Sequence, residues 1–161
     1  LFSGTANLAA REAQQQLAEH YGVGAELHSA TSYKRLREQA LSTERWNRLH
    51  PDQPARTARV TELLEGEGPI VAVTDFMKAV PDQIARWIPH GRSFTPLGTD
   101  GFGRSDTREA LRAYFEIDAP HVVVATLSAL AERGDVKPEL VVDAIKRYGL
   151  DPDSADPRLL P

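Results

Sequence analysis

Cysteine is absent from this 161-residue sequence, and its absence excludes several kinds of chemistry at once. Without a thiol the chain can form no disulfide, no thiolate metal site and no cysteine nucleophile. No apolar run approaches the roughly 18 residues of a membrane-spanning helix, and the first residues lack the charged-then-apolar order of a secretory signal. We therefore expect no membrane partner, and the missing cysteine fits a cytoplasmic location.

A strong excess of charge is also missing. The formal net charge of -4 and the pI of about 5.7 give no overall attraction to nucleic acid. With 41% hydrophobic and 26% charged residues and a mean hydropathy of -0.39, the composition is that of ordinary globular proteins. A chain of this length can bury a core without a metal ion. We therefore expect a single domain over residues 1–161 and no nucleic-acid partner.

Helical and extended patterns alternate along the chain. Apolar residues recur at helical spacing over residues 6–17, and the later helices are expected at residues 33–41, 58–64, 77–87, 107–115, 120–133 and 138–148. Strands are expected at residues 25–29, 70–73 and 92–97, of which 70–73 is an unbroken apolar run. Parallel neighbours need crossover connections, so the alternation predicts a three-layer α/β/α sandwich with a mostly parallel sheet. Strand order stays open.

The two ends of the chain carry further expectations. Leu1 and Phe2 run into the small-residue turn at Gly4 as if a strand were already under way, and no methionine precedes them. We therefore expect a piece of a longer protein. Residues 151–161 are rich in proline and aspartate and are expected to form an extended tail over the surface.

A glycine-rich turn at residues 97–106 is the most informative segment. It lies between a predicted strand and a predicted helix, where open α/β sheets place their ligands. One hypothesis is an anion site over Gly98 to Arg104, formed by free backbone amides and the arginine. Asp100 and Asp106 would repel an anion, however, and the run lacks the lysine of a phosphate-binding loop. We favour a structural interpretation in which Asp106 and Glu109 sit at the helix entrance as in a capping box.

Basic and aromatic residues are mixed over residues 33–59. This segment contains seven lysine or arginine residues and three acidic residues, and Tyr33 and Trp46 lie among them. This pattern suits single-stranded nucleic acid, but tryptophan, tyrosine and arginine also dominate protein interfaces. Because the whole chain is acidic and carries no nucleic-acid motif, we favour an interface.

No catalytic set emerges from the sequence. The five histidines show no helical zinc spacing, and the stretch beginning at Gly91 and Ser93 ends in Thr95 rather than in the glycine of a nucleophile elbow. The paired Glu65 and Glu67 lie in a glycine-rich turn. We therefore predict no catalytic, cofactor-binding or metal-binding residue.

Several motifs together resemble the homodimeric bacterial pyruvate dehydrogenases of the transketolase-like family. They are TERWN (residues 43–47), TDFMK (74–78), LGTDGFGRSD (97–106), FEIDA (115–119), VVVA (122–125) and DPRL (156–159). The resemblance covers essentially the whole chain and is limited to the carboxy-terminal domain of that family. It implies a transketolase C-terminal-domain-like α/β fold.

The resemblance also implies what the parent protein does. The family decarboxylates pyruvate with thiamine diphosphate and magnesium, which are bound by upstream domains, and then acetylates the lipoyl group of the dihydrolipoyl acetyltransferase component. Its cofactor motif is Gly-Asp-Gly followed by paired asparagines, which Thr99, Asp100 and Gly101 echo without any Asn-Asn. The implied role is structural, with the upstream domains and a homodimer partner as neighbours. Two alternatives stay open: a regulatory anion or small-molecule module at the loop from Gly98 to Arg104, and a dehydrogenase for another 2-oxo acid.

Overall fold

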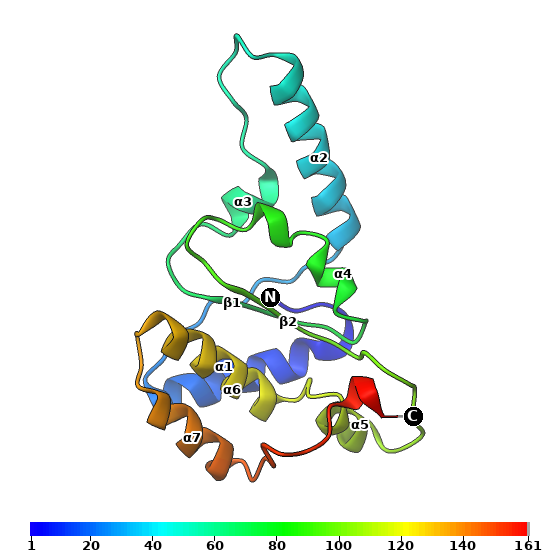
Figure 1. The fold of residues 1–161 in the computed structure, drawn as a ribbon, viewed down its shortest axis with the longest axis vertical. Helices are drawn as coiled ribbons and strands as arrows, with labels where there is room; N and C mark the ends of the chain where they lie inside the picture. The colour runs from blue at the N-terminus through cyan, green and yellow to red at the C-terminus, as the bar shows by residue number, and fades with distance from the viewer. Residues whose placement is uncertain (161) are drawn as a thin grey trace.

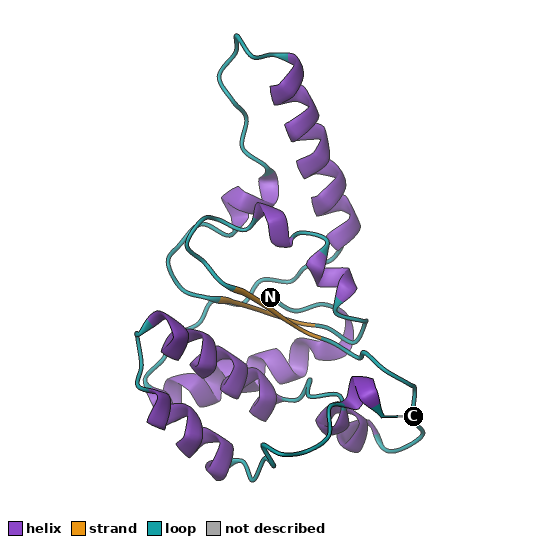
Figure 2. Cartoon of the chain, viewed as in Figure 1, coloured by secondary structure: helices purple, strands orange, loops and turns teal. Residues whose placement is uncertain are grey.

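Parallel extended segments lie between two layers of helices (Figure 1 and Figure 2) in the computed structural model, which describes residues 1–160. Strand β1 (Ile70–Val73) pairs in parallel with β2 (Phe94–Leu97). On its other side β1 is bridged at Val73 to Phe2, which forms a second parallel bridge to Ser29. The order across the sheet is therefore residues 28–30, residues 1–3, β1 and β2, and the predicted parallel sheet is confirmed.

The other regular elements of the described chain are helices. In chain order they are the 3-10 turn η1 (Gly4–Ala6), α1 (Asn7–Tyr21), α2 (Tyr33–Leu49), α3 (Arg59–Leu63), α4 (Ala79–Asp82), η2 (Ala85–Trp87), α5 (Arg108–Tyr114), α6 (Ala119–Arg133), α7 (Pro138–Arg147) and η3 (Pro157–Leu159). Helix α6 begins as the sequence predicts, because the Asp118 side chain accepts a hydrogen bond from the backbone N–H of His121 and proline follows in the first turn.

The alternating side chains of β1 divide the core in two. Val73 packs with α1, α6 and α7 around the fully buried Val123 and Leu127. Ile70 packs on the opposite face with residues of α2 and α3 and with Trp87. Because successive strand residues point to opposite faces, one short apolar strand joins both cores. This arrangement confirms the three-layer α/β/α sandwich.

Three element predictions were wrong in detail. The expected strand at residues 25–29 is reduced to the bridge at Ser29, because the neighbouring extended segment pairs with it at Phe2 alone. The helix expected at residues 33–41 continues without a break to Leu49. The helix expected at residues 77–87, with a break or start near Pro81, is divided into α4 and η2, which are separated at Gln83 and Ile84.

The end of the chain is less extended than expected. Pro157–Leu159 forms the turn η3, at whose start the Asp156 carboxylate accepts a hydrogen bond from the N–H of Arg158. Pro161 lies outside the described residues. Over residues 1–160, no helix is both long enough and apolar enough to cross a bilayer.

Candidate functional site

The glycine-rich loop leaves the carboxyl end of β2 and is fastened to the turn after β1. The N–H of Thr99 donates to the Phe76 carbonyl at 2.9 Å, and the Asp100 carboxylate accepts from the Lys78 N–H at 2.8 Å. A Cβ at Gly98 would lie 2.5 Å from the Phe76 oxygen, so only glycine fits this close approach. Backbone contacts within the chain therefore occupy the first half of the loop.

The carboxy-terminal tail covers the middle of the same loop. Gly101 has a φ of +106°, and a Cβ there would lie 2.6 Å from the carbonyl oxygen of Pro157. Next to that contact the guanidinium of Arg158 binds the Asp156 carboxylate and lowers its pKa to about 2. This contact could not be predicted from the sequence, because residues 101 and 157 meet only in the folded chain.

The end of the loop enters α5 one residue later than predicted. The cap is Thr107, whose side chain accepts from the Ala110 N–H, whereas Asp106 accepts from the N–H of Thr107. Glu109 lies in the first turn, as expected. The Arg104 guanidinium lies over the ring of Tyr114, 4.8 Å from its centroid. The loop thus has the features of a helix entrance closed by local contacts, and none of these contacts favours a bound anion.

The basic and aromatic segment forms a projecting arm, made of α2 and the returning residues 50–58 (Figure 1). Near its tip the ring of Trp46 stacks on the ring of His50, at 4.4 Å between centroids, and the Arg56 guanidinium lies 3.6 Å from the Trp46 ring centroid. The Asn47 side chain also pairs with the backbone N–H and carbonyl of Arg56. These contacts stabilise the arm without a large core.

Charged groups fix the base of the arm to the body of the domain. The Glu44 carboxylate accepts from Arg86 at 2.5 Å and from the indole N–H of Trp87 at 2.7 Å, and the bond from Arg86 lowers the pKa of Glu44. Towards the tip, the side chain of Leu49 is 54% exposed and Arg48 is exposed beside it. The arm therefore presents an apolar and basic surface rather than a reactive centre.

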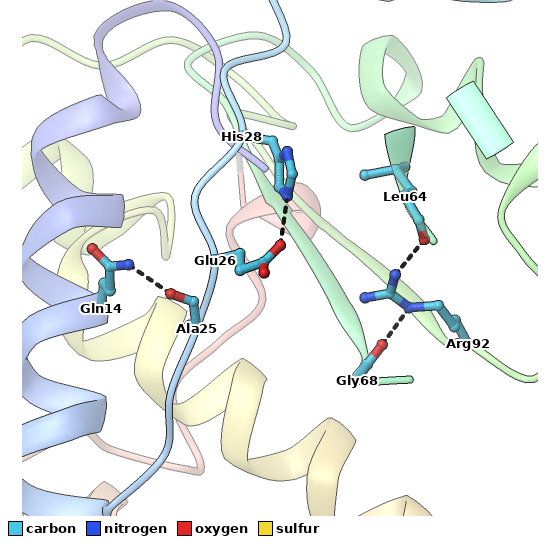
Figure 3. A network of polar contacts seen from close by, with 7 residues as sticks. All are labelled: Gln14, Ala25, Glu26, His28, Leu64, Gly68 and Arg92. Carbon is cyan, nitrogen blue, oxygen red and sulfur yellow. Dashed lines mark hydrogen bonds and ion pairs between the residues drawn. The ribbon is translucent and has the colours of Figure 1, made fainter. Parts of the chain in front are cut away.

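A groove of about 340 Å³ lies beside Leu1 and was not predicted from the sequence. Figure 3 shows its two walls, with Glu26 and His28 on one and Arg92 on the other. The polar side chains near it mostly bind backbone: Gln14 donates to the Ala25 carbonyl at 2.6 Å, and Arg92 donates to the carbonyls of Gly68, at 2.5 Å, and Leu64. No sequence motif could have found the groove, because its walls come from distant segments.

Outside the loop, the arm and the groove, the titratable side chains of the described residues do not gather into a metal-binding group. Over residues 1–160, no three histidine, aspartate or glutamate side chains are grouped so that they could hold a metal ion. The shortest contact between a histidine and a carboxylate, 2.5 Å from His121 Nδ1 to Asp118, lies at the helix cap already described. That no residue is catalytic, cofactor-binding or metal-binding stays a prediction.

Comparisons with known proteins give consistent matches. Residues 1–118 match the model of the transketolase-like TK C-terminal domain. The pyruvate dehydrogenase E1 component of Pseudomonas aeruginosa is 47% identical over 98% of the chain, and that of Escherichia coli is 43% identical over 99%. The corresponding protein of Mycobacterium tuberculosis is 45% identical over 98% of the chain. The chain spans only 17–18% of the length of these curated relatives.

Proposed function

Because the chain belongs to the transketolase-like C-terminal domain family, we propose that it serves the assembly of a pyruvate dehydrogenase E1 component and not its chemistry. The observation that carries the proposal is the 47% identity to such a protein over 98% of the chain. The longer protein would decarboxylate pyruvate and acetylate the lipoyl group of the acetyltransferase component. We further propose that it acts in the cytoplasm, which cell fractionation tests.

Thiamine diphosphate and magnesium would be held by the upstream domains, because residues 99–101 do not fit them. The Asp100 carboxylate accepts from the Lys78 N–H, and Gly101 is covered by the carbonyl of Pro157. A diphosphate cradle needs free N–H groups and carboxylate oxygens that are open to the metal ion. No catalytic step is therefore assigned to this chain.

Isothermal titration tests this division of labour. We expect the 161-residue chain to show no saturable heat when titrated with thiamine diphosphate and magnesium. Saturable binding in the micromolar range would contradict the proposal.

Substrate choice is tested on the longer protein encoded by the same gene. With thiamine diphosphate, magnesium and the lipoyl domain present, pyruvate should be the preferred donor of the acyl group. A kcat/KM that is higher for a branched or dicarboxylic 2-oxo acid would favour the dehydrogenase of another 2-oxo acid.

The arm supports the assembly role. Its surface combines Leu49 with arginines next to the stacked Trp46, the residue types that anchor protein interfaces. The relatives that the chain matches are several times longer, so a large part of such a protein is available to cover the arm. We propose that the arm packs against the upstream domains and the homodimer partner and helps to hold the dimer together.

A further inference from the structure

The two sides of α2 differ in how they are used. Tyr33, Ala40 and Thr43 are buried along one side of the helix. On this inner side the Gln39 carbonyl accepts a hydrogen bond from the N–H of Arg59 at 2.8 Å, which ties α2 to the start of α3. Figure 1 shows that the arm stands clear of the sheet and of the helix layer formed by α1, α6 and α7. The outer side of α2 is therefore available to a partner.

The outer side carries cations and leucines in one stripe. Lys34, Leu41, Arg45 and Arg48 follow one another at intervals of seven, four and three residues, and these intervals place them on one side of a helix. The three basic side chains are exposed, and Leu41 is half-buried. Leu49, which is 54% exposed, follows Arg48 at the end of the helix. The stripe therefore combines apolar surface with positive charge.

Carboxylates of the same chain leave part of this charge unmatched. Glu44, which lies next to Arg45 in the sequence, is bound by Arg86 at the base of the arm, at 2.5 Å. Among residues 1–160, Arg45 and Arg48 form no ion pair. Both guanidinium groups can therefore pair with carboxylates of another molecule.

The distribution of charge along the chain indicates which surface the arm fits. Residues 33–59 have a formal charge of +4, from seven basic and three acidic residues, whereas the whole chain has -4. The rest of the chain therefore has -8. Two arms would repel each other, but the arm of one copy is complementary in charge to the acidic remainder of a second copy. This distribution favours contact between an arm and an acidic surface of the homodimer partner.

The tip of the arm is shaped before any partner binds. The Trp46 ring stacks on His50 and lies beside the Arg56 guanidinium, and the Asn47 side chain pairs with the backbone of Arg56. A surface that is already ordered loses less conformational entropy on binding. Single-stranded nucleic acid needs an aromatic ring on which a base can stack, whereas the Trp46 ring is already engaged by two neighbours. The arrangement therefore favours a protein partner.

We propose that the outer side of α2 docks on an acidic surface of the homodimer partner in the longer protein. Carboxylates of that surface would lie opposite Arg45 and Arg48, and an apolar contact would cover Leu49. The inference rests on the proposed function, which takes the arm to be an interface, and it adds the chemistry of the surface that receives the arm. Such complementarity fixes the register of an interface and makes its affinity fall with ionic strength.

Sedimentation equilibrium of the longer protein at low and high salt tests the proposal. Arg45→Glu should raise the dimer dissociation constant by roughly tenfold or more at about 50 mM salt, because like charges would then face each other. The increase should largely disappear at about 1 M salt, where the screening length is about 3 Å.

Two variants serve as controls. Arg11→Glu makes the same change of net charge at an exposed position of α1, outside the arm. Arg45→Lys keeps the positive charge at the tested position. Both should leave the dissociation constant within about twofold of the unchanged protein, as exposed charges outside an interface and charge-conserving changes do.

The possible outcomes separate this inference from the proposed function. A dissociation constant for Arg45→Glu equal to that for Arg11→Glu would overturn the acidic partner surface. If Leu49→Asp still raised the constant, the arm would remain an interface and only this inference would fail. If neither arm variant changed it, the proposed assembly role would fail as well. Binding of a single-stranded RNA oligomer that is lost in Arg45→Glu, with an unchanged dimer, would overturn the inference in favour of nucleic acid.

Discussion

The amino group of Leu1 is largely buried in the 161-residue chain, and its environment makes stability depend on pH. Burial, with the charge of Arg92 as a smaller cause, lowers its pKa from 8.0 to about 6. Between these values the unfolded chain binds a proton that the folded chain does not. Stability should therefore rise by roughly 2 kcal/mol from pH 6 to pH 8, which is most of the about 2.7 kcal/mol that corresponds to the whole shift of two pKa units.

Urea unfolding at pH 6 and pH 8 measures this difference. The amino-terminally acetylated chain is the control, because it keeps all other titrating groups. If the acetylated and free chains change stability equally over this range, the pKa of Leu1 is not lowered by folding.

Gly101 marks where the tail meets the glycine-rich loop. Because its φ is +106° and a Cβ would come within 2.6 Å of the Pro157 oxygen, Gly101→Ala should destabilise the chain by about 1–3 kcal/mol. It should also make the tail more sensitive to limited proteolysis. Gly103→Ala is the matched control, since a Cβ there meets nothing within 4 Å. Equal urea midpoints for the two variants would rule out the contact.

Glu44 joins two elements, the arm helix α2 and the turn η2. Arg86 lowers the pKa of Glu44 in the folded chain, so the carboxylate stabilises the fold above its unfolded pKa and loses this effect as the pH falls through the folded value. Glu44→Gln should lower the urea midpoint at pH 7, and the deficit should shrink below about pH 4.

Glu38→Gln is the control for this prediction, because Glu38 makes only an exposed pair with Lys34 at 3.7 Å. A midpoint for Glu44→Gln that matches this control at pH 7 would mean that the base of the arm is held by packing alone.

Elements with strong local signals were predictable, and elements that depend on neighbours were not. The helix from Ala119 was predictable because a capping Asp118, a first-turn proline and an apolar face agree. Residues 25–29 have the alternation of a strand, but a strand also needs a paired neighbour. Here the only bridge joins Ser29 to Phe2. The cap at Thr107 differs from the predicted Asp106 because adjacent cap-forming residues compete.

At the scale of the whole molecule, the layer architecture followed from the sequence but the surfaces did not. Apolar periodicity and the run Ile70–Val73 predict a covered parallel sheet, since both faces of such a strand must be buried. The groove beside Leu1 and the tail over Gly101 bring together residues that are distant in the chain. No local rule of composition or spacing reports such contacts.

The most direct test of the assembly role is the dimer dissociation constant of the longer protein, measured by sedimentation equilibrium. Leu49→Asp places a charge on the exposed arm, and Val142→Asp places one on α7, at the far end of the domain from the arm (Figure 1). We predict that the first raises the dissociation constant by roughly tenfold or more, as loss of an interface anchor does, and that the second leaves it unchanged. A dissociation constant that Leu49→Asp does not change would contradict the account.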